Sequence, residues 1–156
     1  MSNLNMLSIE AIEQNANLDV KTLYETGTVL QQQGKIAAAI DSYQQAISYW
    51  KKHPEPALLS CAAGAYSNWG CILVQEGKFD EAIAVFAAGI AVAPDDAPLY
   101  NNLGIVLLEI SKPEQAIALY RRAIELDSEL VITRYNLGKA FQQLGLHIFA
   151  GECFAG

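Results

Sequence analysis

The sequence has little positive charge and no paired cysteine motif. Only 10 Lys and Arg stand against 17 Asp and Glu, and the net charge of −7 argues against a nucleic-acid footprint. Three cysteines, Cys61, Cys71 and Cys153, lack CxxC spacing, so we expect free thiols in a reducing, cytoplasmic compartment. The two histidines, His53 and His147, lie far apart. We therefore expect no metal site, cofactor or catalytic triad.

Long uncharged apolar runs and targeting segments are also scarce. The uncharged run 82–94 is far shorter than the ~20 residues that a membrane span needs. The N-terminal residues show no basic stretch followed by an apolar core, so no signal peptide is expected. These features predict no membrane association, while a hydrophobic content of 52% excludes a mainly disordered chain.

What the sequence does contain is an internal repeat of 34 residues. The segment 100–104 reads YNNLG, and the segments 34 residues before and after it read YSNWG and RYNLG. The segment 116–120 reads AIALY, and its counterpart at 82–86 reads AIAVF. A fixed period of this length indicates an array of structural repeats.

The repeat predicts how the chain is divided. We expect a flexible or short-helical lead-in at 1–18 and a repeat array over 19–156. Gly27 and Gly70 are 43 residues apart, so an insertion of nine residues is placed at about 54–62. The array then consists of three full helical units and one truncated unit, at about 20–53, 63–96, 97–130 and 131–156.

Turn and cap residues set the expected helix ends. Asn17 or Asp19 can cap the first helix of the first unit. Gly77 is expected to end the first helix of the second unit, and Ser111 stands at the matching place in the third unit. Because Glu114 follows Ser111 by three residues, we expect these two to form a capping box for the next helix.

These residues resemble the tetratricopeptide repeat family, whose 34-residue pattern reads W-x2-L-G-x2-Y…A-x3-F…P. The third unit matches it at Tyr100, Gly104, Ala116 and Tyr120. The resemblance implies an all-α fold, a right-handed α-α superhelix of helix-turn-helix repeats. It also implies a non-enzymatic scaffold that binds a protein or an extended peptide in a concave groove lined by the first helices.

Four glycines lie inside the predicted first helices, where glycine costs up to ~1 kcal/mol relative to alanine. That cost is acceptable if each glycine lets a neighbouring helix approach closely. We expect the approaching side chains to be Tyr43, Phe86, Tyr120 and Phe154, with small alanines beside them.

Three asparagines, Asn68, Asn102 and Asn136, recur once per unit. An amide donates and accepts at once, so such a column can hold the backbone of an extended peptide. In this respect the groove resembles the asparagine ladder of O-linked N-acetylglucosamine transferases. The alternative is that asparagine is simply solvated here. The other expected groove residues are Tyr24, Thr28, Cys71, Gln75, Asn101, Ile105, Glu109, Tyr135, Lys139 and Gln143.

Some relatives in this family grip acidic chaperone tails with a cluster of Lys, Arg and Asn. In this sequence Tyr24, Thr28, Pro98 and Asn102 occupy the matching places, and only Asn68 agrees. We therefore expect a largely uncharged extended segment as the ligand.

Two further surfaces carry open alternatives. The uncharged second helix of the second unit is either a convex contact surface around Val85 and Ala88 or a mildly apolar, alanine-rich surface. The unfinished fourth unit predicts either that the polypeptide continues or that this end packs on another molecule, including self-association.

A substrate-docking region of a larger enzyme, a glycosyltransferase or methyltransferase, is the alternative function.

Overall fold

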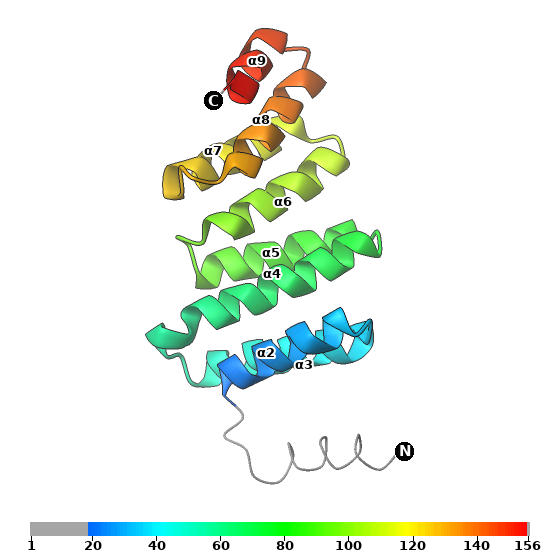
Figure 1. Ribbon diagram of the computed structural model, residues 1–156, viewed down its shortest axis with the longest axis vertical. Coiled ribbons are helices and arrows are strands. Elements are labelled where there is room, and N and C mark those ends of the chain that lie inside the picture. Colours follow the sequence, from blue (N-terminus) through cyan, green and yellow to red (C-terminus); the bar gives the residue numbers. More distant parts are fainter. Residues whose placement is uncertain (1–18, 156) are drawn as a thin grey trace.

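The computed structural model describes residues 19–155, except for the side chains of His147, Ile148 and Ala155. The predicted lead-in at 1–18 lies outside these residues. The described residues form four helix pairs that follow one another along a single stack (Figure 1). The fold is a right-handed α-α superhelix, as predicted. The first helices of the pairs are α2 (Val20–Gln32), α4 (Leu59–Gln75), α6 (Ala97–Glu109) and α8 (Val131–Gln143). The second helices are α3 (Ile36–Lys52), α5 (Phe79–Val92), α7 (Pro113–Leu126) and α9 (His147–Ala155).

The first helices hold the stack together. Each of α4, α6 and α8 packs on the second helix of its own unit and on the second helix of the unit before it. Neighbouring first helices also touch, so α2, α4, α6 and α8 form a continuous row. We call this the first-helix row, because every residue expected to bind a peptide lies on it.

Within each unit, an aromatic ring of the second helix lies directly on a glycine of the first helix. A Cβ built on Gly27 would lie 2.6 Å from Cε1 of Tyr43, and one built on Gly104 would lie 2.6 Å from Cε1 of Tyr120. Gly70 and Gly138 meet the rings of Phe86 and Phe154 in the same way. The expectation that these glycines permit close helix approach is confirmed. The alanines beside the rings are almost fully buried: Ala39, Ala82, Ala116 and Ala150.

The turn that closes each first helix requires a left-handed residue. Gly34, Gly77 and Gly145 have φ values of 72–73°, and Ser111 takes their place with a φ of 59°. The Ser111 N–H donates to the Leu108 carbonyl at 3.1 Å, which closes α6. The predicted capping box is therefore wrong. Helix α7 begins after Lys112 with no side-chain cap, because Ser111 is used to end the helix before it.

The insertion lengthens two helices and adds a short turn between them. Helix α3 has 17 residues, whereas the other second helices α5 and α7 have 14, and helix α4 has 17 residues, whereas the first helices α6 and α8 have 13. The 3-10 turn η1 (Pro56–Leu58) leads directly into α4, so Pro56 stands at the start of a long helical segment. Asp19 caps α2 as expected, since its carboxylate accepts the Thr22 N–H at 2.7 Å.

The run 56–75 contradicts the expectation of only short uncharged stretches. These 20 residues form η1 and α4, and their length and mean hydropathy of 1.3 are enough for a membrane span. In the fold, however, α4 contacts α2, α3, α5 and α6. Its apolar character is explained by this central position, which the uncharged sequence alone could not reveal.

We predict that Ser111→Gly raises the free energy of unfolding by about 0.5–1 kcal/mol. Glycine adopts a left-handed conformation without the steric cost that a Cβ brings. The midpoint of urea unfolding measures this change. Gly77→Ser is the matched control, because it introduces the same side chain into the equivalent turn and should lower the midpoint. A lower midpoint for Ser111→Gly would contradict the explanation.

Candidate functional site

The side chains expected to bind a ligand differ widely in exposure. Gln75, Glu109, Tyr135, Lys139 and Gln143 are exposed on the first-helix row. The half-buried ones are Tyr24, Thr28, Asn68, Cys71, Asn102 and Ile105, while Asn101 and Asn136 are buried. The first-helix row therefore exposes uncharged side chains together with one acidic and one basic side chain. Some of its polar side chains are instead hydrogen-bonded inside the protein.

Between the first and second units, Asn68 bonds to a tyrosine. Its Nδ2 donates to the Tyr43 hydroxyl at 3.1 Å, and that hydroxyl donates to Oε1 of Gln31 at 2.8 Å. Tyr24 lies over Gly64, where a Cβ would come within 2.8 Å of its ring. The second unit is thus joined to the first by one hydrogen-bonded chain and one aromatic contact.

Between the second and third units, Asn102 takes the same joining role. Its Nδ2 donates to Oγ of Ser67 at 3.0 Å and lies 3.7 Å from Sγ of Cys71. Burial raises the pKa of the Cys71 thiol, so this cysteine is protonated at neutral pH. A protonated thiol is a poor nucleophile.

Between the third and fourth units, the buried Asn101 collects two hydrogen bonds. Its Oδ1 accepts from Nδ2 of Asn136 at 3.1 Å and from Oγ1 of Thr133 at 3.2 Å. Its own Nδ2 donates to Oδ1 of Asn102 at 3.4 Å. Asn101 and Asn136 are only 7% and 8% exposed.

These bonds correct part of the predicted asparagine ladder. Asn101 and Asn136 are buried, and Nδ2 of Asn136 donates to Oδ1 of Asn101 inside the interface between units, so these two groups are engaged within the protein. The sequence reasoning followed the 34-residue column and missed Ser67 and Thr133. A spacing of 35 residues separates Ser67 from Asn102 and Asn101 from Asn136 and would have pointed to these two pairs, whereas Thr133 lies 32 residues from Asn101. The peptide-binding role of Asn68 and Asn102 stays a prediction.

The tyrosine of the third unit lacks the partners that its counterpart in the first unit has. The Tyr120 side chain is fully buried, and its hydroxyl has no hydrogen-bond partner among the described residues. Leu108 stands four residues after Gly104, where Gln31 follows Gly27. Burial, and then the negative charge of Glu109, raise the pKa of the Tyr120 hydroxyl, so it remains a proton donor.

A pocket of about 340 Å³ opens on the first-helix row between the last turns of α6 and α8. Its lining combines one acid, one base and two amides around an apolar side chain: Leu108, Glu109, Lys139, Gln142 and Gln143. No ion pair within 4 Å involves Glu109 or Lys139 in the described part of the chain. Both charges are therefore free to interact with a ligand.

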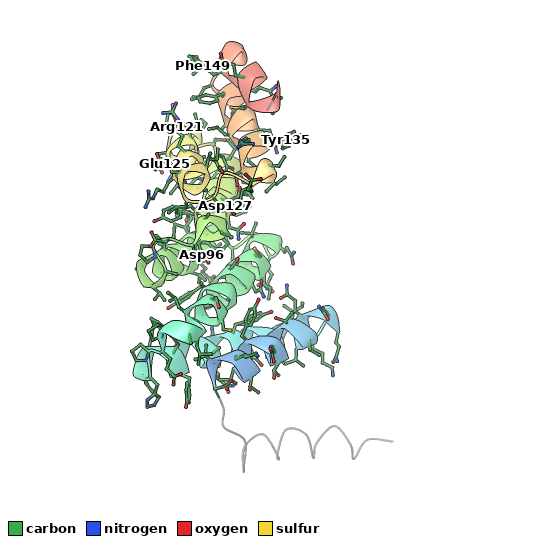
Figure 2. The ribbon with its side chains drawn as sticks, turned by 60° about the vertical axis from the view of Figure 1, so that its left-hand side comes forward. Asp96, Arg121, Glu125, Asp127, Tyr135 and Phe149 are labelled. Carbon is green, nitrogen blue, oxygen red and sulfur yellow. The ribbon has the colours of Figure 1, made fainter. Side chains whose placement is uncertain are left out.

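The far end of the stack carries most of the exposed apolar side chains. Six of the eight large exposed hydrophobic residues of the described chain belong to the fourth unit: Val131, Ile132, Tyr135, Leu146, Phe149 and Phe154. Tyr135 and Phe149 project from different sides of this unit (Figure 2). The Tyr135 ring lies 5.5 Å from that of Phe154, whereas the Phe149 ring lies 5.6 Å from that of Phe141.

The structure also corrects the predicted convex contact on α5. Val85 is 7% exposed and belongs to the core, and Ala88 is half-buried against that core. The exposed residues of this helix between 82 and 92 are the small side chains Ala84, Ala87 and Ala91. The alternative of an alanine-rich outer surface therefore describes α5 correctly.

Within residues 19–155, no cluster of His, Cys, Asp and Glu with metal-binding geometry is found.

Family comparisons agree with this architecture. Profiles described as tetratricopeptide repeat match residues 20–52 and 67–130. A solved structure, the second TPR of Spaghetti (RPAP3) bound to the HSP90 peptide SRMEEVD, is 30% identical. The match covers 60% of this chain and 86% of that one, with a TM-score of 0.58. The chain belongs to the tetratricopeptide repeat family.

Two other solved tetratricopeptide structures show the same fold at lower identity. The MamA RS-1 ArsTM double mutant is 24% identical, with a TM-score of 0.74 over 97% of this chain and 79% of its own. BtubC (BKLC) from P. vanneervenii is 18% identical, with a TM-score of 0.76 over 91% of this chain and 63% of its own. No curated protein sequence matches the chain significantly.

We predict opposite effects of removing the hydroxyls of Tyr43 and Tyr120. Tyr43→Phe should lower the free energy of unfolding by about 1–2 kcal/mol, because Gln31 and Asn68 both lose a partner. Tyr120→Phe should leave it unchanged or raise it by up to about 1 kcal/mol, because it removes a buried hydroxyl without a partner. Urea unfolding of both variants measures the difference. Equal losses would show that Tyr120 has a partner after all.

Proposed function

We propose that the protein is a non-catalytic scaffold that binds an extended peptide segment along the first-helix row. The pocket between α6 and α8 is the observation that carries this proposal, because it is an open site lined by unpaired charged and amide groups. Membership of a family of protein-interaction scaffolds supports it. A cytoplasmic location is part of the proposal, on the ground of three free cysteines.

The charge of the row favours an uncharged segment over an acidic one. Lys21 and Glu25 lie 3.9 Å apart and offset each other, and the pocket adds one glutamate and one lysine. The RPAP3 domain binds the acidic peptide SRMEEVD. A row that is close to neutral has no net attraction for such a ligand. We therefore propose that this chain differs from RPAP3 in its ligand class.

The proposed affinity is modest. Hydrogen bonds contribute about 0.5–1.5 kcal/mol each, and association itself has a large entropic cost. With Asn101 and Asn136 used between units, few amides are left to hold a peptide backbone, so a micromolar or weaker dissociation constant is expected. Docking of a substrate segment for a larger enzyme would use the same row and the same residues.

A photo-cross-linking experiment tests this binding surface without perturbing it. Peptides are first selected from a random dodecapeptide display library on the full chain and then resynthesised with a photo-reactive group. We expect cross-links to the row at Gln75, Ile105 and Lys139, and none to the outer surface of α5 at Ala84 and Ala87. We also expect SRMEEVD to bind at least about tenfold more weakly than the selected peptides. Cross-links confined to α5, or tighter binding of SRMEEVD, would refute the proposal.

The aromatic end of the fourth unit favours a second function, self-association. In the first unit, the equivalent pair Tyr24 and Tyr43 is covered by α4, which places Gly64 against the Tyr24 ring. In the fourth unit Tyr135 remains 53% exposed beside Phe154. We propose that a second copy covers this end through a twofold interface, since such symmetry buries the same patch on both copies.

Light scattering over a range of protein concentrations tests self-association. We expect the molar mass to rise toward that of a dimer, and Tyr135→Glu to weaken the dimer at least about tenfold, because it would bury a charge in the interface. Val29→Glu is the control, since Val29 is 50% exposed at the other end of the stack. A strict monomer at the highest concentration, or equal effects of both variants, would exclude this interface.

A further inference from the structure

A second pocket, of about 360 Å³, opens where α4 begins and where the loop after α5 leads into α6. Its lining on α4 comes from the first turns of that helix, whereas Gln75 stands at the last residue of α4. None of the residues expected to bind a peptide lines this pocket. It is therefore a site separate from the one proposed above, and we call it the α4 pocket.

Most of the α4 pocket is lined by apolar groups. Pro56 of η1 and Leu59 at the start of α4 belong to the insertion at about 54–62. Ala63 of α4 and the loop residues Ala93 and Pro94 add further hydrocarbon surface. A hydrocarbon chain that enters the pocket can thus leave water and pack against apolar atoms.

Asp96 adds a carboxylate to this apolar lining, at the point where the loop meets α6 (Figure 2). The carboxylate caps α6, because its Oδ1 accepts the Leu99 N–H at 3.1 Å. No ion pair within 4 Å involves Asp96 in the described part of the chain. Burial raises the pKa of the Asp96 carboxyl group, since the hydrogen bond from Leu99 compensates only part of the lost hydration. A cation beside Asp96 would offset the remaining cost.

The neighbouring Asp95 also lines the pocket and is only weakly neutralised. Its Oδ1 lies 3.9 Å from Nη2 of Arg122, and the Asp95 side chain is 85% exposed. An exposed pair at this distance contributes little, and Arg122 also lies 3.3 Å from Glu125. The lining itself contains no Lys, Arg or His, so it carries a negative charge.

The next unit boundary does not repeat this combination. Thirty-four residues further on, Asp127 and Ser128 stand at the places of the apolar Ala93 and Pro94, and Leu130 stands at the place of Asp96. Helix α6 follows α5 after a loop of four residues, 93–96, with no counterpart of η1. The apolar walls beside an unpaired carboxylate are therefore a property of the second unit and its insertion, not of the repeat.

We propose that the α4 pocket binds the side chain of a lysine or arginine presented by a partner protein. These two side chains combine a hydrocarbon stem, which packs along the apolar walls, with a cation that pairs with Asp96. An anionic side chain would be repelled by the two aspartates, and an uncharged one would leave Asp96 without a compensating charge. The partner is thus recognised at a place that the peptide on the first-helix row does not occupy.

The test uses Nα-acetyllysine methylamide as the probe and the full chain as the target. Backbone amide resonances are followed by NMR while the probe is added up to tens of millimolar. We expect saturable shifts at 59–63 and 95–99, and similar binding of the arginine analogue. The norleucine analogue, which has the same stem without the charge, should bind at least about fivefold more weakly. Absence of saturable shifts, or equal binding of the norleucine analogue, would overturn the inference.

A pair of cap variants separates the Asp96 contact from the general negative charge of the protein. Asp96→Asn should weaken probe binding at least about fivefold, because asparagine caps a helix as well as aspartate does but carries no charge. Asp19→Asn is the matched control: it removes the same charge from the cap of α2 and should leave binding unchanged. Full binding by Asp96→Asn, or equal losses in both variants, would refute the proposed contact.

A third variant tests the place of binding independently of charge. Ser60 is exposed and lines the α4 pocket, so Ser60→Trp should fill the space and abolish probe binding while circular dichroism shows an unchanged helix content. Unchanged probe binding by a folded Ser60→Trp protein would show that the lysine side chain binds elsewhere.

Discussion

The structure depends on the contact between one glycine and one aromatic ring in each unit. A Cβ at any of the four glycines would come closer to the ring than real Cβ contacts do, and the rings of Tyr43, Phe86 and Tyr120 are fully buried. Side chains in a packed interior cannot yield that space, so the helix crossing itself requires glycine. The crossing fixes the distance between the two helices of a unit. That distance in turn decides where the first helices meet and where their exposed residues lie.

The polar groups of the first-helix row serve two purposes that compete for the same atoms. Asn68 and Asn102 donate across the interfaces between units, and Asn101 accepts across the next one. Amides used in this way hold the row together but offer less to a ligand. The pocket between α6 and α8 is lined by Glu109 and Lys139, and neither forms an ion pair within 4 Å in the described structure.

The relation to solved tetratricopeptide structures is one of fold. The MamA and BtubC structures share the superhelix at 24% and 18% identity, which says nothing about ligand chemistry. RPAP3 is closer in sequence and binds an acidic peptide, but the row described above balances its charges. Specificity within a repeat family is set by a few exposed positions on a common scaffold, so a shared fold is compatible with different ligands.

The sequence alone determined the repeat, the helix pairs and the glycine–ring contacts, because a period of 34 residues places equivalent side chains in equivalent surroundings. It failed where one polar residue had two candidate roles or partners. Ser111 and Glu114 had the spacing of a capping box, yet closure of α6 placed Ser111 in a left-handed turn. Asn136 matched the column of Asn102, yet only the packed interface showed that its amide bonds to Asn101. Local spacing cannot decide between two partners for one polar group, since the choice depends on which atoms the superhelix brings within hydrogen-bonding distance.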